Sequence, residues 1–214
     1  MPLWINNMSG IIAQNVGRPS GLVKATEAGG GAWVEIKSLT ASADSTLSFV
    51  DGTSDVVLDS TYPIYCFKFI NCSTTAGERT FDFNGSVDTG SNYNVTKTST
   101  FFRAQHTESD STELDYQTGN DLAQGTGFQN LVANLNSDTD SSCSGILYLF
   151  EPSSTTFVKH FISQVHAIGN SVQSANNFCA GYFNTTSAVD AIQFKMSADN
   201  INTGTIKLFG IKDS

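Results

Sequence analysis

Hydrophobic and polar residues alternate with a period of two along most of the chain after residue 31. Successive side chains of a β-strand point to opposite faces, so this period is typical of strands that bury one face. About ten segments show it, and Gly, Asn, Asp, Ser and Thr separate them. They are residues 33–39, 46–50, 62–71, 79–83, 101–107, 145–151, 157–167, 178–183, 191–196 and 205–211.

Helical periodicity is weak throughout. The best candidate helix, residues 121–135, is interrupted by Gly125 and Gly127. Many short strands joined by turn residues favour a sandwich or a jelly roll, and 214 residues suit one such domain. The sequence therefore predicts an all-β protein, an antiparallel, jelly-roll-like β-sandwich of about ten strands.

The last two strand segments enclose a turn-rich stretch, Ser197 to Gly204. Ile192, Phe194 and Met196 mark the apolar face of the first segment. This pattern predicts a β-hairpin, and a chain end that is itself a paired strand is fixed in a sheet. Nothing in the hairpin indicates catalysis.

Residues 1–31 have no clear strand or helix period and end in Gly29, Gly30 and Gly31. We predict an N-terminal arm here, followed by a β-sandwich domain at 32–214. The arm would lie across the body or reach a neighbouring subunit; the alternative is an irregular loop with one edge strand. The arm's apolar residues are the predicted interface: Leu3, Trp4, Ile5, Ile11 and Ile12.

The polar residues are mostly uncharged, and the charged residues are mostly acidic. Charged residues make up only 14% of the chain, whereas it has 26 Ser, 23 Thr and 17 Asn. The net charge is −9, so the basic footprint that nucleic acid or an anionic membrane requires is missing. The longest apolar run, Ile146 to Phe150, is too short to span a membrane, and the stretch MPLWINNMSG lacks the features of a secretory signal.

Four cysteines occur, with no C-x-x-C spacing and no zinc-type pattern with the three histidines. A disulfide framework is not expected at this length and spacing. Cys66 lies within an apolar strand segment, where a free thiol acts as a small hydrophobic group. The other cysteines are Cys72, Cys143 and Cys179.

Several polar clusters could carry chemistry, but each has a simpler explanation. The carboxylates of HTESDSTELD (His106, Glu108, Asp110, Glu113, Asp115) could cleave a glycosidic bond or hold a metal, yet they lie in the most hydrophilic stretch and suit a solvated loop. Asn136, Asp138 and Asp140 have calcium-loop spacing, but the Gly and the final Glu of an EF-hand are missing.

Two histidines and two tyrosines are further candidates for a binding site. His160 and His166 are too far apart along one strand to share a metal, and exposed aromatics such as Tyr93 or Tyr116 could stack on sugar rings. We predict no catalytic residue, no metal ligand and no cofactor.

Two stretches resemble the small β-rich virion proteins of tailed, often marine, bacteriophages. One is STYPIYCFKFINCS, with GSNYNV downstream of it, and the other is DAIQFKMSADNINTGTIKLFGIKDS. The likeness covers most of residues 60–211 through loose structural motifs. The matching positions are Tyr62, Tyr65, Phe67 and Phe69, then Gly204, Ile206, Leu208, Phe209, Gly210 and Ile211.

The resemblance implies a non-enzymatic virion structural protein, and it transfers no catalytic residue. We expect a capsid decoration (cement) protein, made in the host cytoplasm, that self-associates and binds the major capsid protein or other virion proteins on the capsid surface. The alternative is a tail-fibre module that recognises host surface carbohydrate, for which an exposed aromatic beside carboxylates in residues 84–127 would be the sign. A glycan-cleaving enzyme built on residues 106–115 is a third, weaker hypothesis.

Overall fold

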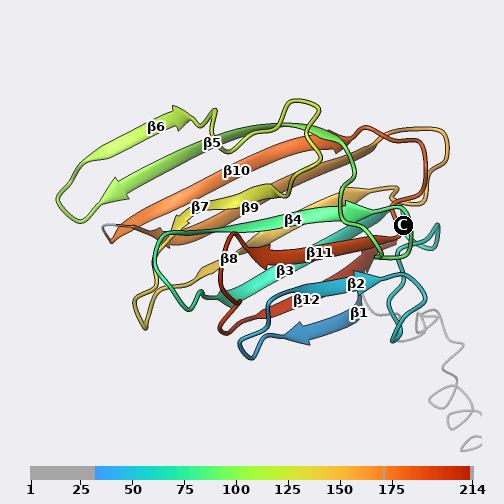
Figure 1. Ribbon diagram of the computed structural model, residues 1–214, viewed down its shortest axis with the longest axis horizontal. Coiled ribbons are helices and arrows are strands. Elements are labelled where there is room, and N and C mark those ends of the chain that lie inside the picture. The colour runs from blue at the N-terminus through green and yellow to red at the C-terminus, as the bar shows by residue number, and fades with distance from the viewer. Residues whose placement is uncertain (1–31, 171, 213–214) are drawn as a thin grey trace, which may run out of the picture. The chain divides into compact units, whose positions relative to one another are not determined.

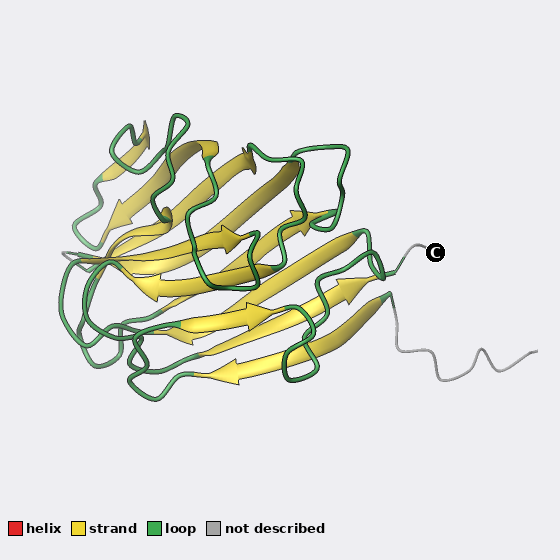
Figure 2. Ribbon diagram, turned by 45° about the vertical axis from the view of Figure 1, so that its right-hand side comes forward, coloured by secondary structure: helices red, strands yellow, loops and turns green. Residues whose placement is uncertain are grey.

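The computed structural model describes residues 32–170 and 172–212, which form an all-β body of twelve antiparallel strands (Figures 1 and 2). The strands are β1 (Trp33–Thr40), β2 (Leu47–Val50), β3 (Ile64–Cys72), β4 (Arg79–Ser86), β5 (Lys97–Thr107), β6 (Thr112–Tyr116), β7 (Gln129–Leu135), β8 (Cys143–Phe150), β9 (Lys159–Gly169), β10 (Gln173–Phe183), β11 (Ala191–Met196) and β12 (Thr205–Ile211).

All twelve strands belong to one sheet that curls over itself. We call β1-β12-β3-β8-β9-β10-β5-β6 the long run and β7-β4-β11-β2 the short run. The two runs are joined where Leu135 of β7 pairs with Gly169 of β9. The predicted all-β class is confirmed. The predicted two-sheet sandwich is not what forms, because this junction makes one nearly closed, barrel-shaped sheet.

The core lies between the two runs and is rich in phenylalanine. Phe194 of the short run lies 5.2 Å, between ring centroids, from both Phe67 and Phe69 of the long run. Phe83 lies 5.1 Å from Phe161 in the same way. These rings are buried, and edge-to-face pairs at such distances add to the hydrophobic gain of burial. The inward positions of the alternating strands therefore hold the runs together.

The predicted terminal hairpin is wrong. β11 pairs with β4 and β2, whereas β12 pairs with β1 and β3. The connection from Ser197 to Gly204 crosses from the short run to the long run, so that Phe194 and Ile206 are both buried in the core between the runs. The alternating pattern of the two segments is the same whether they pair with each other in a hairpin or lie in different runs. The expectation that β12 is fixed in a sheet is confirmed.

Two strands were missed by the sequence pattern. β6 lies in the polar stretch, pairs only with β5 and is exposed on most of its side chains. β7 occupies the second half of the candidate helix 121–135, whose first half is loop. Among the described residues no helix could cross a lipid bilayer.

Candidate functional site

The face of the long run that points away from the short run is an extended apolar surface, which we call the outer face. Six of its large apolar side chains are exposed, with Leu114 at 73% and Ile162 at 52%. Monomeric proteins seldom expose a large continuous apolar surface without using it for binding. The exposed members are Trp33, Ile70, Phe102, Leu114, Tyr116 and Ile162, and half-buried neighbours are Ile146, Tyr148, Phe178 and Phe209.

The strand register makes this surface continuous. On β8, β9 and β10, Tyr148 stands opposite Ile162, and Ile162 opposite Ala180. Further along the run, Phe178 stands opposite Phe102, and their rings stack with 4.7 Å between centroids. Residues directly opposite on antiparallel strands touch through their side chains. The apolar groups therefore lie on four neighbouring strands, with the polar Gln164 between Ile146 and Phe178.

At the β1 end of the outer face, aromatic rings cluster under a lysine. The Trp33 ring lies 5.9 Å from Phe209 and 6.2 Å from Tyr148, between centroids. The Lys68 ammonium sits 4.4 Å from the centre of the Trp33 ring. This cation–π contact fixes a positive charge on the apolar surface. Cys66 lies on the same side of β3 and is fully buried.

Charge is divided between the two ends of the outer face. Lys68 and Lys207 lie on β3 and β12, near the β1 end, and Lys207 also pairs with Glu35 at 3.0 Å. At the opposite end the β5–β6 hairpin carries Glu108 and Asp110 in its turn. The apolar surface therefore runs from a basic end to an acidic end.

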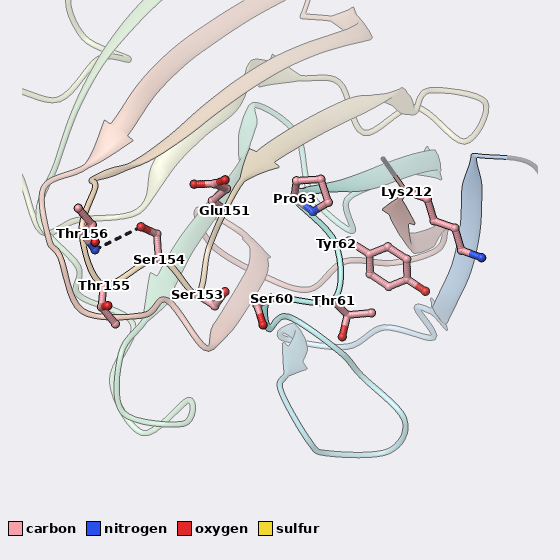
Figure 3. A pocket seen from close by; sticks show the side chains of 10 residues that line it. All are labelled: Ser60, Thr61, Tyr62, Pro63, Glu151, Ser153, Ser154, Thr155, Thr156 and Lys212. Atoms are coloured by element: carbon pink, nitrogen blue, oxygen red, sulfur yellow. Dashed lines mark hydrogen bonds between the residues drawn. The ribbon is translucent and has the colours of Figure 1, made fainter. Parts of the chain in front are cut away.

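A second candidate site is a hollow between the residues that precede β3 and the loop that follows β8 (Figure 3). Its volume is about 760 Å³, within the size range of small-molecule sites. Hydroxyl groups of the loop 153–156 lie on one side, and Tyr62 and Lys212 on the other. The lining residues are Ser60, Thr61, Tyr62, Pro63, Glu151, Ser153, Ser154, Thr155, Thr156 and Lys212.

Glu151 links this hollow to a smaller one of about 400 Å³, lined also by Phe157 and His160. Its backbone N–H donates to the Pro63 carbonyl at 2.8 Å, which ties the loop after β8 to the start of β3. Glu151 has a φ of 43°, a left-handed conformation that is uncommon outside glycine. Within the described residues its carboxylate has no hydrogen-bond or ion-pair partner, so it is free to accept from a ligand.

The structure places the predicted carboxylate cluster on the β5–β6 hairpin. His106 Nε2 lies 3.1 Å from Asp110 Oδ1, with both side chains exposed. Glu113 accepts from Gln105. No group of three His, Cys, Asp or Glu in the described part of the chain is arranged to hold a metal ion. The hairpin therefore gives no support to an active site at residues 106–115.

The hairpin does border a shallow hollow of about 490 Å³ that sequence spacing did not suggest. His106 on β5 and His166 on β9 both line this hollow. The two strands are far apart in the sequence but flank β10, which pairs with both. His166 Nε2 is 2.9 Å from the Ser174 hydroxyl. His160 lines a different hollow.

The remaining predicted residues make local contacts. Asn136 donates to Asp138 at 2.8 Å and accepts from the backbone of the same turn, which describes an Asx-type turn. Tyr116 is exposed, and its hydroxyl donates to Asp121 at 2.5 Å. An exposed aromatic beside a carboxylate thus does occur within residues 84–127, but on a flat part of the outer face. Tyr93 is half-buried beside Gly90.

Sequence reasoning missed four buried charged groups, which are the side chains of Asp82, Lys97, Arg103 and Lys159. Burial lowers the pKa of Lys97 to about 7, and its ammonium donates to the Gly127 carbonyl at 2.7 Å. Burial raises the pKa of Asp82 to about 7, and its Oδ1 has no partner in the described structure. Lys159 is buried and donates to the Phe157 and Thr185 carbonyls. None of the four lines a hollow described above.

The predicted interface residues Leu3, Trp4, Ile5, Ile11 and Ile12, with the whole arm 1–31, lie outside the described residues. Comparison with protein-family models, curated proteins and solved structures finds no match for the chain.

Proposed function

We propose that this is a non-enzymatic virion structural protein that decorates a bacteriophage capsid and works by contact with copies of itself and with other virion proteins. The observation that carries the proposal is the exposed apolar outer face, which water disfavours and a protein partner would cover. The resemblance of residues 60–211 to phage virion proteins supports the virion as the setting.

A second copy of the chain is the partner that the outer face fits best. Its basic end carries Lys68 and its acidic end carries Glu108 and Asp110. In a two-fold symmetric pair the same patch meets itself. When the axis crosses the outer face at right angles to the line that joins the two ends, the basic end of one copy lies over the acidic end of the other. Opposite charges would then fix the register while apolar burial stabilises the contact.

Electron microscopy of phage particles with and without the protein tests the virion assignment. We expect particles that lack it to lose a regular surface feature of the head and to recover it when purified protein is added back. Particles that are identical in the two preparations would contradict a decoration role.

A second candidate function, recognition of host surface carbohydrate, is favoured by the hollow beside Glu151. Aromatic rings, hydroxyls and a free carboxylate together suit a sugar, which offers hydroxyls for hydrogen bonding and a C–H face for stacking. Binding on an array of bacterial surface glycans, weakened by Glu151→Ala but unchanged by Glu108→Ala, would support it. Absence of binding to any glycan would count against it.

A further inference from the structure

Two of the four cysteines stand directly opposite each other. Cys72 ends β3 and Cys143 begins β8, and the two residues are register partners in the β3–β8 ladder. Both are buried, at 0% and 1% exposure. The spacing of these residues along the sequence gives no sign of this pairing.

A β-bulge creates the juxtaposition. Phe69 pairs with Gly145, so strict alternation would turn Cys72 away from the core, but the register shifts between Phe69 and Cys72. Asn71 takes a left-handed conformation with φ of 51°. Its N–H donates to the Ser144 hydroxyl at 2.9 Å, which fixes the bulge beside Cys143. The extra residue therefore turns Cys72 inward to face Cys143.

The opposite side of Cys72 is held by Gly204. This glycine has φ of 121°, and a Cβ there would lie 2.5 Å from the Cys72 Cα and 2.8 Å from the Asn71 carbonyl oxygen. The β12 side of the sheet is thus in close contact with the cysteine backbone. Cys72 has little freedom to move away from Cys143.

The geometry is within reach of a disulfide. Directly opposed residues have Cβ atoms about 4.5–5.5 Å apart, and a disulfide needs about 3.5–4.5 Å. The approach required is about 1 Å at a strand end beside a bulge, where the backbone adjusts most easily. The other two cysteines have no such partner: Cys66 pairs with Tyr148 and Phe209, and Cys179 with Phe101 and Ser163.

We propose that Cys72 and Cys143 are an oxidation site and close to a cross-strand disulfide when the protein meets a peroxide or a low-molecular-weight disulfide. This inference stands on the cysteine geometry and is independent of the proposed function. The disulfide would link β3 to β8 directly. It would close a covalent loop from Cys72 to Cys143 that contains β4, β5, β6 and β7, four of the twelve strands, which belong to both runs.

The two thiols have different roles in the reaction. The hydrogen bond from the Cys143 thiol lowers the pKa of Cys72, so Cys72 forms the thiolate. That thiolate attacks hydrogen peroxide, the O–O bond breaks, and Cys72 becomes a sulfenic acid as water leaves. The Cys143 sulfur then attacks the sulfenic sulfur and releases a second water. Overall two thiols and one peroxide give one disulfide and two waters.

Access to the buried pair comes through local opening of the strand ends, which costs less than global unfolding. Oxidation is therefore expected to be slower than for an exposed thiol. Once formed, the bond restrains the unfolded chain and opposes separation of β3 from β8. We expect the oxidised protein to unfold at least about tenfold more slowly than the reduced protein in the same denaturant.

The test is to oxidise the reduced full-length chain with hydrogen peroxide or oxidised glutathione and to map its peptides. Trypsin separates all four cysteines, with Cys72 in peptide 69–79 and Cys143 in peptide 104–159. We expect these two peptides to be joined, and two of four thiols to remain titratable after denaturation. The double variant Cys66→Ala/Cys179→Ala is the control and should form the same link with the same slowing of unfolding.

Cys143→Ala should abolish both the link and the slowing. If that variant fails to fold, the wild-type peptide map still decides the question. Four free thiols after oxidation, or links that involve Cys66 or Cys179 in place of the 69–79 to 104–159 pair, would overturn the proposal.

Discussion

The stability of this protein should pass through a minimum near neutral pH, because two buried groups titrate there with opposite effects. Asp82 has its pKa raised to about 7 by burial, from an ordinary 3.8. Lys97 has its pKa lowered to about 7 by burial, from an ordinary 10.5. Most globular proteins are instead most stable in the range from about pH 5 to 8.

The sign follows from which state binds the proton more tightly. Folded Asp82 holds its proton up to about pH 7, whereas unfolded Asp82 loses it near 3.8, so the stability present at low pH is lost as pH rises between these values. Folded Lys97 loses its proton near 7, whereas unfolded Lys97 keeps it to 10.5. Stability is therefore regained as pH rises above 7.

The magnitudes come from the pKa shifts. A shift of about three pKa units for Asp82 corresponds to about 4 kcal/mol of unfolding free energy lost from about pH 4 to 7. Lys97 returns about 3 kcal/mol between about pH 7 and 9. Above about pH 9 the gain is opposed, because burial raises the pKa of the Cys66 thiol to about 12 and its deprotonation then favours unfolding.

Urea unfolding at about pH 4.5, 7 and 9, at one ionic strength and with a reductant present, measures these changes. Asp82→Asn keeps the shape of the side chain and should remove most of the fall from acid to neutral pH. Lys97→Met keeps its length and should remove most of the rise from neutral to alkaline pH.

A free energy of unfolding that is highest near pH 7 in the wild type would refute this reasoning. So would Asp82→Asn and Lys97→Met variants whose pH profiles match the wild-type profile, because the slopes would then arise elsewhere.

Two substitutions test the packing. Phe194→Ala removes a ring that contacts both runs and should cost roughly 3–5 kcal/mol in urea unfolding, whereas the exposed Phe157→Ala should change stability by less than about 0.5 kcal/mol; similar losses for both would contradict the core described here. Gly145→Ala would place a Cβ 2.6 Å from the Val165 Cα in the β8–β9 pair and should lower the melting temperature clearly, while Gly119→Ala meets no atom within 4 Å and should not; equal melting temperatures would show that β8 and β9 are less closely packed.

Alternation predicted the class and most strands because inward positions carry large apolar groups. It did so for Tyr65, Phe67 and Phe69 on β3, which are all buried. It failed at β6, whose side chains are mostly exposed and so carry no apolar period. It also failed at β7, because the two glycines before this strand made the segment look like a broken helix.

Strand pairing could not be deduced from the pattern. The segments 191–196 and 205–211 look like a hairpin, yet Phe194 and Ile206 belong to opposite walls of one core. A period of two shows that a strand has a buried face, but it does not show with which strands that strand pairs. The β11–β12 error arose from this ambiguity.

The candidate sites depend on pairing and were therefore mostly missed. Tyr62 and Glu151 share a hollow only because Ile64 pairs with Phe150, and Cys72 meets Cys143 only through a bulge. The residues of the outer face become neighbours only when the eight strands of the long run stand in their order. One local signal was available: Pro63 and Pro152 both flank apolar strands, which marks two strand ends that could lie together.

The most direct test of the central claim, that the outer face binds a second copy, is the mass of the full-length protein by light scattering across a concentration series. We predict an oligomer for the wild type, and a monomer for the double variant Ile162→Lys/Phe102→Lys, which places charge in the middle of the outer face. Val87→Lys changes an equally exposed apolar residue outside the outer face and should leave the oligomer intact. A monomeric wild type, or an oligomer that survives the double variant, would contradict the account.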